Sequence, residues 1–521
     1  MRRAIRARRS ASAAPAAAPS ASLCAAFLSA LLLLPLLMAL TAPVNHDEDQ
    51  YVGAAALIGH AVIYRDFMSL QTPLHAYVFA PLMAAGTWAF PAMRAATALL
   101  ASITLLLAYR AQRWLGAGWR RAMGATLLLL CCTAFQVGAS VVRNDILPAL
   151  LLTVAIIAAV RALRRAGGVA ALPAGLAIGL AISAKASYAP FAPALCLGLL
   201  LLPQPARPRF GQRLAIGCIA GTGVLIGLLP AFLCWYRAPD AFWWGVVIFA
   251  RTAPQAYYAA SGQAGWLTPE GKLLRLLLVA LEGPALAVML LRLAGRPRAS
   301  GEAGASAIRL LDIFTVAGLV AAFIPTPSWR QYLLPALPSL FITFGLIPGG
   351  GRARDRIRAG LLLFALVGLA RPARDVALAV VDGSPPLHAA RSARMTEAEL
   401  AAAGIEGPVA TVSIHAVLGA RQGFDIRFAT GPFITRESGL LNPARATAFH
   451  VAPADMVAMS FDRSPPSAIL TGDEHPSEMF PLRQDQPLRD YAVAHAYRLH
   501  RLPGDDGELF IAPTQKMTVP R

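Results

Sequence analysis

The chain has 521 residues, of which 56% are apolar and only 14% are charged, and its formal net charge is +19. A soluble globular protein is about a quarter charged, so this composition excludes an ordinary soluble domain and is typical of a protein with many membrane-spanning helices. The basic excess does not indicate a nucleic-acid partner, because the arginine clusters alternate with apolar runs instead of lining one face of a soluble domain.

The chain begins with a basic, Ala/Ser/Pro-rich stretch over residues 1–23, which we predict to be disordered and cytoplasmic. The first apolar run follows at 24–44. It could be a signal peptide, but it is longer than the usual apolar region of about 7–15 residues and lacks a clear cleavage site. We therefore favour a retained membrane span, and either choice places Asp47 outside the cytoplasm.

Long apolar runs then recur along the chain. With about 20 residues needed per span, they predict about eleven transmembrane helices. These are 24–44, 94–112, 122–141, 146–163, 169–186, 188–203, 214–236, 273–293, 310–325, 331–348 and 359–380. With the N-terminus in the cytoplasm, this count places every arginine cluster between spans on the cytoplasmic side, as the positive-inside rule requires.

One apolar run, over residues 73–90, does not fit this alternation. Counting it as a span would move the next arginine cluster to the outside. We interpret it as a helix lying in the outer membrane interface or as a re-entrant segment, within an outer loop over 45–93. His75, Tyr77 and Trp88 suit an interfacial position.

The composition changes after residue 381, where the chain becomes polar and rich in proline. Short strand-like runs occur at 407–414, 467–473 and 508–513. We therefore divide the chain into a transmembrane domain over 24–381 and a soluble α/β domain over 382–521, which the span count places in the periplasm. The predicted fold class is an α-helical polytopic membrane protein with a C-terminal soluble α/β domain.

Acidic residues gather at the predicted outer face. Asp47, Glu48 and Asp49 follow the first span directly, and Asp145 lies at the outer end of the third. Cations lie at the same predicted level, namely Arg143, Lys185 and Arg330. A solvated loop explains an acidic triplet on its own, but acids and cations from distant parts of the chain at one level predict a site at the outer mouth.

The stretch "DEDQYVGAAALIGHAVIYRDFMSLQTPLHAYVFAP" resembles the first outer loop of the GT-C class of polyprenyl-phosphate-sugar-dependent glycosyltransferases. This class includes protein O-mannosyltransferases and the lipid A aminoarabinose transferase. The matching elements are Asp47-Glu48 with Tyr51, then Tyr64, Asp66 and Phe67, then Pro73. "RNDILPALL", "GLAIGLAISAK" and "RQYLLPALP" resemble three later blocks in the same order.

The resemblance implies a bacterial inner-membrane enzyme that transfers a sugar, with inversion, from a polyprenyl-phosphate donor. The acceptor would be a lipid, a glycan or a protein, and membrane lipids surround the helices. Asp47 corresponds to the catalytic base, Glu48 would orient it, and Asp145 would be a second acid at the site. The donor phosphate would be bound by Lys185, Arg330, Arg143 and His75, and the substrate loop would contain Tyr51, Tyr64, Asp66, Phe67 and Pro73.

No cofactor is expected, and the six cysteines show no metal-ligand spacing, although a divalent metal stays open. The chain departs from the aminoarabinose transferase pattern at Thr72, where that pattern has a lysine before the proline. This leaves open which cation replaces it and argues against that particular activity. The alternative functions are a transporter or flippase for a lipid-linked sugar, and a structural or sensor protein with a ligand-binding outer domain.

Overall fold

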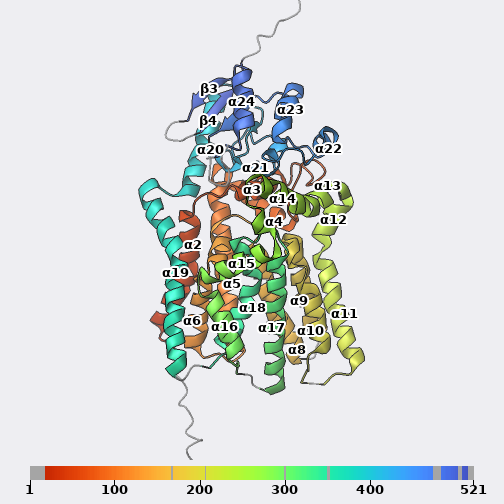
Figure 1. Cartoon of the computed structure of the whole chain (residues 1–521), viewed down its shortest axis with the longest axis vertical. Helices are drawn as coiled ribbons and strands as arrows, with labels where there is room; N and C mark the ends of the chain where they lie inside the picture. Colours follow the sequence, from red (N-terminus) through yellow and green to blue (C-terminus); the bar gives the residue numbers. More distant parts are fainter. Residues whose placement is uncertain are drawn as a thin grey trace, which may run out of the picture.

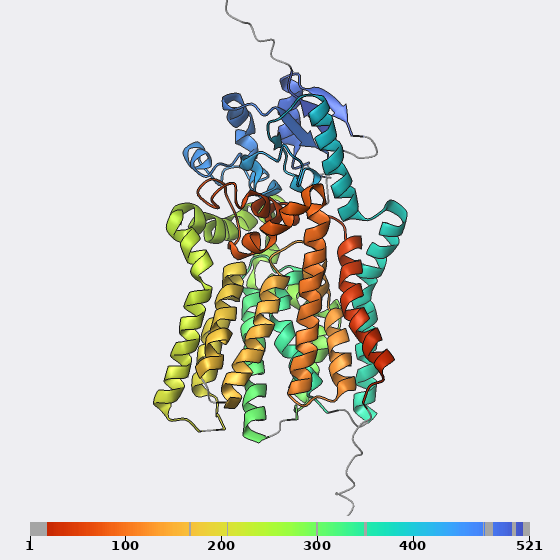
Figure 2. The same cartoon turned by 180° about the vertical axis from the view of Figure 1, so that it is seen from behind.

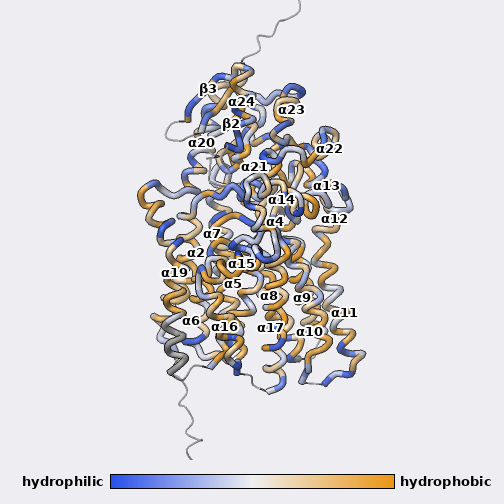
Figure 3. Tube along the Cα trace, viewed as in Figure 1, coloured by the Kyte–Doolittle hydropathy of each residue, from blue (hydrophilic) through white to orange (hydrophobic). Residues whose placement is uncertain are grey.

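The computed structural model describes residues 18–165, 168–205, 207–298, 301–348, 352–472, 474, 483–502 and 507–513. A tall bundle of helices lies below a smaller domain formed by the C-terminal part of the chain (Figures 1 and 2). Apolar residues dominate the bundle, and polar residues gather in the small domain and at the lower ends of the helices (Figure 3). This distribution suits a membrane around the bundle and water on either side.

The helices of the bundle are α2 (Ala21–Thr41), α5 (Ala89–Trp114), α6 (Trp119–Leu130), α7 (Thr133–Ser140), α8 (Ile146–Arg165), α9 (Gly168–Ala184), η2 (Ala186–Tyr188), α10 (Phe191–Leu201), α11 (Phe210–Gly227), α12 (Leu229–Arg237), α15 (Pro269–Leu281), α16 (Ala285–Ala294), α17 (Gly301–Phe323), η5 (Arg330–Ala336), α18 (Leu337–Gly345) and α19 (Arg352–Asp382). Short elements at the upper end are α3 (Asp47–Leu57), α4 (Leu74–Phe79), η1 (Ala80–Trp88), α13 (Pro239–Trp243), η3 (Trp244–Phe249), α14 (Ala250–Ala260) and η4 (Ala264–Leu267).

Each predicted span falls on one or two of these helices. Within the described residues, five helices are long and apolar enough to cross a membrane, or seven if two bent pairs each count as one span. The bent pairs are α6 with α7, at 69°, and α15 with α16, at 94°. The structure therefore has a multi-helix membrane architecture, and the count of eleven spans stays a prediction.

The run at 73–90 forms α4 and η1 instead of one regular helix. The break before α5 lies at Gly86, whose φ of 58° is readily adopted by glycine. Because α4 lies at the upper end of the bundle and packs against α3, an interfacial position remains our prediction for it (Figure 1).

The closest helix packing in the bundle joins α9 to α11. Gly175 and Gly179 on α9 face Gly223 and Gly227 on α11, and a Cβ atom at any of the four would overlap the backbone of the other helix. Small residues four apart let membrane helices approach this closely. Ser183 adds a hydrogen bond of 2.8 Å from its Oγ to the carbonyl of Gly227, which fixes the upper end of α9.

The small domain contains a four-stranded sheet in the order β1-β2-β4-β3. The strands are β1 (Val409–Ala410), β2 (Ala468–Thr471), β3 (Arg498–Arg501) and β4 (Glu508–Ile511). β1 and β2 are parallel, whereas β4 runs antiparallel to both β2 and β3. The three strand-like runs of the sequence contain β1, β2 and β4, and β3 was not predicted because its sequence, "RLHR", is polar.

The helices of the small domain are α20 (Pro385–Ala402), η6 (Ile414–Ala416), η7 (Ile426–Phe428), α21 (Pro432–Thr435), α22 (Pro443–Ala448), η8 (Ala454–Met456), α23 (Val457–Arg463) and α24 (Gln486–Ala494). Part of the core of this domain is its own, around Phe428, Phe461 and Tyr491. A second apolar cluster combines residues of the outer loop, such as Phe67, with residues of the domain, such as Ile414. The domain is therefore packed on the outer loop, and its core is not entirely its own.

Candidate active site

Asp47 is the first residue of α3, and it is held by one backbone contact and by two contacts to its carboxylate. Its backbone N–H donates to Asn45 Oδ1 at 2.8 Å, and its Oδ2 pairs with Arg143 Nη1. The imidazole Nε2 of His46 lies 3.3 Å from the other carboxylate oxygen. The Asp47 side chain is 21% exposed, so it is fixed in place and still reachable from solvent.

His46 is electrostatically a neutral neighbour of Asp47. Burial, assisted by the positive charges of Arg436 and Arg143, lowers the pKa of His46 to about 4. At neutral pH this side chain is therefore an uncharged imidazole, and Arg143 supplies the positive charge that faces Asp47.

Arg143 connects Asp47 to a second acid deeper in the protein. Its Nε donates to Asp145 Oδ2 at 3.1 Å, and Asp145 Oδ1 pairs with Lys185 Nζ. The Lys185 ammonium also lies 4.8 Å from the centre of the Tyr332 ring. Burial alone would raise the pKa of Asp145, but Lys185 and Arg143 together outweigh it and hold that pKa below its usual value, so this acid is ionised.

Glu48 points away from Asp47 into the protein, where it is fully buried. It pairs with Arg94, which is also fully buried, through bonds of 2.7 and 2.5 Å. The same carboxylate accepts the backbone N–H of Val142 at 2.6 Å, one residue before Arg143. Glu48 therefore joins α3, α5 and the α7–α8 connection, and it fixes the backbone on both sides of the Asp47–Arg143 pair.

Asn144, between Arg143 and Asp145, extends this framework. Its Oδ1 accepts from the Tyr51 hydroxyl at 2.9 Å, and its Nδ2 donates to Gln71 Oε1 and to the carbonyl of Ala184, both at 3.0 Å. Since Ala184 precedes Lys185, this amide ties the position of the lysine to the outer loop.

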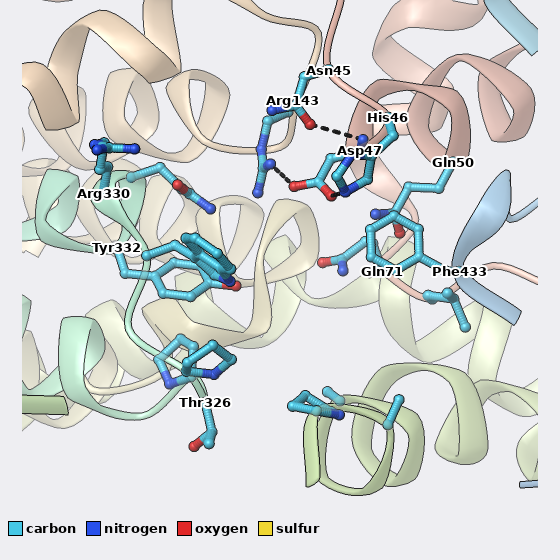
Figure 4. Close-up of a pocket in the computed structure, with 18 of the residues that line it drawn as sticks. Asn45, His46, Asp47, Gln50, Gln71, Arg143, Thr326, Arg330, Tyr332 and Phe433 are labelled. Atoms are coloured by element: carbon cyan, nitrogen blue, oxygen red, sulfur yellow. Dashed lines mark hydrogen bonds and ion pairs between the residues drawn. The ribbon is translucent and has the colours of Figure 1, made fainter. Parts of the chain in front are cut away.

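Asp47, Arg143 and Lys185 line a pocket of about 310 Å³ at the junction of the bundle and the small domain. Arg330 and Tyr332, at the start of η5, lie across the pocket from Asp47 (Figure 4). Arg330 is 43% exposed in its side chain and is paired with Glu282 at 2.7 Å. The lining also includes several aromatic and cationic residues, among them Tyr51, Tyr257, Tyr258, Trp329, Arg371, Phe433 and Arg436.

Two of these lining residues belong to the small domain. Phe433 lies on α21, and Arg436 is the residue directly after this helix. The guanidinium of Arg436 stacks 4.4 Å from the centre of the Phe433 ring. It also lies 4.9 Å from the ring centre of Tyr257 on α14. The pocket therefore has one wall from the membrane helices and one from the C-terminal domain.

Several residues predicted for the site do not line this pocket. His75 is buried beneath Tyr51, with ring centres 5.3 Å apart, and it stacks on Phe79. Asp145 and Glu48 lie behind the pocket wall, where they contact Arg143 and Val142. The remaining substrate-loop residues Tyr64, Asp66, Phe67 and Pro73 also lie outside the lining.

These loop residues have local structural contacts instead. The Tyr64 hydroxyl donates to the carbonyl of Gln71, and Asp66 accepts the N–H of Val62 at 2.8 Å while pairing with Arg65. Phe67 is fully buried, and Pro73 directly precedes α4. These contacts shape the loop that positions Gln71 in the pocket. The four side chains themselves do not reach the pocket, so the structure gives them a role in loop structure.

Asp49 is buried and joins the outer loop to the C-terminal domain. Its Oδ1 accepts the backbone N–H of His415 at 2.8 Å and lies 2.9 Å from the Nδ1 of the same residue. Glu48 and Asp49 are both inaccessible to solvent, so the alternative of a solvated acidic loop does not fit this triplet. Among the described residues, no group of three or more His, Cys, Asp or Glu side chains is arranged to hold a metal ion.

Sequence reasoning missed Arg94, Asn144, Phe433 and Arg436. A signal existed for Arg94, because an arginine at the start of an apolar span needs a buried partner. Asn144 stands inside the "RND" motif that the sequence already pointed to. Phe433 and Arg436 carry no such signal, since only the docking of the small domain brings them to the pocket.

No protein-family model matches the sequence, and no curated protein matches it. Solved structures do match the fold. The crystal structure of ArnT from Cupriavidus metallidurans bound to undecaprenyl phosphate covers 95% of this chain and 99% of that chain, at 15% identity and a TM-score of 0.58. The apo structure of the same protein covers 94% and 97%, at 15% identity and a TM-score of 0.56.

An apo oligosaccharyltransferase from Archaeoglobus fulgidus covers 86% of this chain and 69% of that chain at 12% identity, with a TM-score of 0.44 that is too low to support an argument. The ArnT matches extend over nearly the whole of both chains, so they include the helical bundle and the C-terminal domain together. The GT-C resemblance predicted from the sequence is therefore confirmed at the level of the fold.

Proposed function

We propose that this protein is a glycosyltransferase of the bacterial inner membrane, with its N-terminus in the cytoplasm and its C-terminal domain in the periplasm. It moves a sugar from a polyprenyl-phosphate donor to an acceptor on a lipid, a glycan or a protein. The observation that carries this proposal is the pocket itself, where a reachable carboxylate, Asp47, stands beside Arg143 and Lys185. That the ArnT structure of the same fold is bound to undecaprenyl phosphate supports a lipid phosphate as part of the donor.

The reaction needs a base on one side of the sugar and a stabilised anion on the other. The acceptor hydroxyl loses its proton to Asp47 as its oxygen attacks the anomeric carbon. The bond from that carbon to the phosphate oxygen breaks on the opposite face, so the configuration inverts. The electron pair remains on the lipid phosphate, whose negative charge is stabilised by nearby cations.

Arg143 is suited to connect these two events. It contacts Asp47 through Nη1 and Asp145 through Nε, while its Nη2 donates to no residue in the described part of the chain. A phosphate bound between Arg143 and Lys185 would draw the guanidinium away from Asp47 and raise the basicity of that carboxylate. We expect Asp145 to keep both cations in position, since it is ionised and bonded to each of them.

The C-terminal domain contributes one wall of the pocket, which we assign to the acceptor. Phe433 and Arg436 face the membrane-helix wall, and the aromatic rings of Tyr257 and Trp329 complete this part of the lining. We infer that this wall binds the acceptor, and that the cations of the bundle bind the donor.

The proposal is tested with purified protein in liposomes that contain a polyprenyl-phosphate-linked sugar and an extract of envelope acceptors. The expected result is release of free polyprenyl phosphate together with a new glycosylated product. A transporter or flippase would move the donor across the bilayer without cleaving it. Sugar transfer from a nucleotide donor, with no turnover of the lipid-linked donor, would contradict the proposal.

A further inference from the structure

A second hollow lies at the opposite end of the bundle from the C-terminal domain. It is a groove of about 860 Å³ between α5, α8 and α9. Its walls are mostly apolar, with residues such as Leu107 and Ile157, and three arginines open onto it, namely Arg110, Arg113 and Arg161. The groove shares no lining residue with the pocket at Asp47.

The arginines converge because of their helical spacing. On α5, Leu106, Arg110 and Arg113 share one face, and on α8 the same is true of Val154, Ile157 and Arg161. Each face is apolar toward the middle of the bundle and cationic in its last turns. The groove therefore has apolar walls along most of its length and a positively charged end.

Trp114 lines the basic end of the groove, and two arginines contact its ring. The guanidinium of Arg161 lies 5.7 Å from its ring centre, and that of Arg164 lies 4.9 Å away. Trp114 still exposes 40% of its surface, and Val154 at the rim exposes 38%. An indole at the end of a membrane helix, between arginines, is typical of the level of the lipid headgroups.

No Asp or Glu side chain is among the lining residues of this groove in the described part of the chain. In the described part of the chain, Arg110, Arg113 and Arg161 form no ion pair, and the single hydrogen bond from Arg113 goes to the carbonyl of Ala117 at 2.6 Å. The positive-inside rule accounts for arginines at this end in general. It does not account for three of them meeting at the mouth of one apolar groove. Such a groove is complementary in shape and charge to a phospholipid with an anionic headgroup.

We propose that this groove binds one anionic glycerophospholipid of the cytoplasmic leaflet. Its phosphate lies among Arg110, Arg113 and Arg161, and an acyl chain lies along Leu107 and Ile157. Charge-assisted hydrogen bonds from guanidinium to phosphate favour an anionic headgroup over a zwitterionic one, in which an ammonium group already balances the phosphate. The bound lipid fills the gap between α5, α8 and α9 and holds these three helices together.

The test uses native mass spectrometry of the full-length protein, stripped of lipid and titrated with phosphatidylglycerol or phosphatidylethanolamine. We expect one phosphatidylglycerol to be retained at higher affinity than phosphatidylethanolamine. The double variant R110Q/R161Q should lose about tenfold to thirtyfold in affinity for phosphatidylglycerol and little for phosphatidylethanolamine.

The matched control is R209Q/R296Q, which removes the same charge from exposed positions outside the groove. An equal loss in this control would show that charge spread over the whole end attracts the lipid, and would overturn the proposal. Equal affinity of the wild type for the two lipids would overturn it as well, as would unchanged binding by R110Q/R161Q. If that variant does not fold, the single variant R110Q serves for the same comparison.

Discussion

Replacing Arg94 by methionine should be the most damaging single change in the outer half of the protein. Arg94 and Glu48 are both fully buried and paired through two hydrogen bonds, so R94M leaves a buried carboxylate without its counter-charge. Breaking a buried pair in this way costs about 3–5 kcal/mol of unfolding free energy. Arg94 also donates to the carbonyls of Ala39, Ala42, Pro43 and Ser140, and losing those bonds adds to the cost.

The assay is chemical unfolding of the purified protein in mixed micelles, with sugar transfer measured in parallel. The control R65M breaks the Arg65–Asp66 pair on the same outer loop, whose side chains are 60% and 35% exposed, and should change the unfolding free energy far less than R94M does, because water screens an exposed pair. The double variant E48Q/R94M should cost less than the two single changes added together, because no lone charge remains. If R94M unfolds within about 0.5 kcal/mol of the wild type, the buried pair does not organise the site as we have argued.

Three further outcomes are expected. Lys185→Gln should slow transfer by about a hundredfold to a thousandfold, as loss of one donor to a developing anion does, and a rate equal to wild type would exclude a phosphate contact. Phe433→Ala should raise the KM for the acceptor and leave donor binding unchanged, whereas a change in donor affinity alone would place this wall on the wrong substrate. Burial, with help from the neighbouring charge of Asp49, raises the pKa of Glu474 to about 8, so the folded protein retains a proton that the unfolded chain releases near pH 4.5. Stability should therefore fall as the pH rises from about 4.5 to 8, and E474Q should flatten that fall in thermal unfolding; an unchanged profile for E474Q would refute the assignment.

The level of the candidate site could be predicted because membrane helices confine residues to levels, whereas the buried positions of His75 and Glu48 behind the pocket could not. With the span directions that the arginine alternation predicts, Arg143, Asp145, Lys185 and Arg330 all fall at the outer ends of their spans. The structure brings Arg143, Asp145 and Lys185 into one chain of contacts that begins at Asp47, with Arg330 across the pocket.

Partners that are distant in sequence and not confined by a helix could not be predicted. Asp49 meets His415, 366 residues further on, only because the C-terminal domain docks on the outer loop. The same docking brings Phe433 and Arg436 into the pocket. The bend between α6 and α7 also could not be predicted, because the sequence is apolar across the break at Cys131 and Cys132. The bend between α15 and α16 did have a sequence signal, since Gly283 and Pro284 interrupt that run.

A test of Asp47 by substitution needs a matched acidic residue as a control. Asp49 belongs to the same acidic triplet but is not suitable for this purpose. Its carboxylate is buried and bonded to His415, so Asp49→Asn would disturb the domain contact. Asp240, an exposed acid at the start of α13 on the same side of the bundle, is the better matched residue.

The most direct test of the account is the single-turnover transfer rate of Asp47→Asn at saturating donor. The amide keeps the shape of the side chain but cannot take the proton of the acceptor hydroxyl. The account predicts a rate lower by about 10²–10⁴-fold, equivalent to about 3–5 kcal/mol of barrier, with donor binding and folding intact and with Asp240→Asn at the wild-type rate. A variant that transfers sugar as fast as the wild type would remove Asp47 from the chemistry and contradict the central claim.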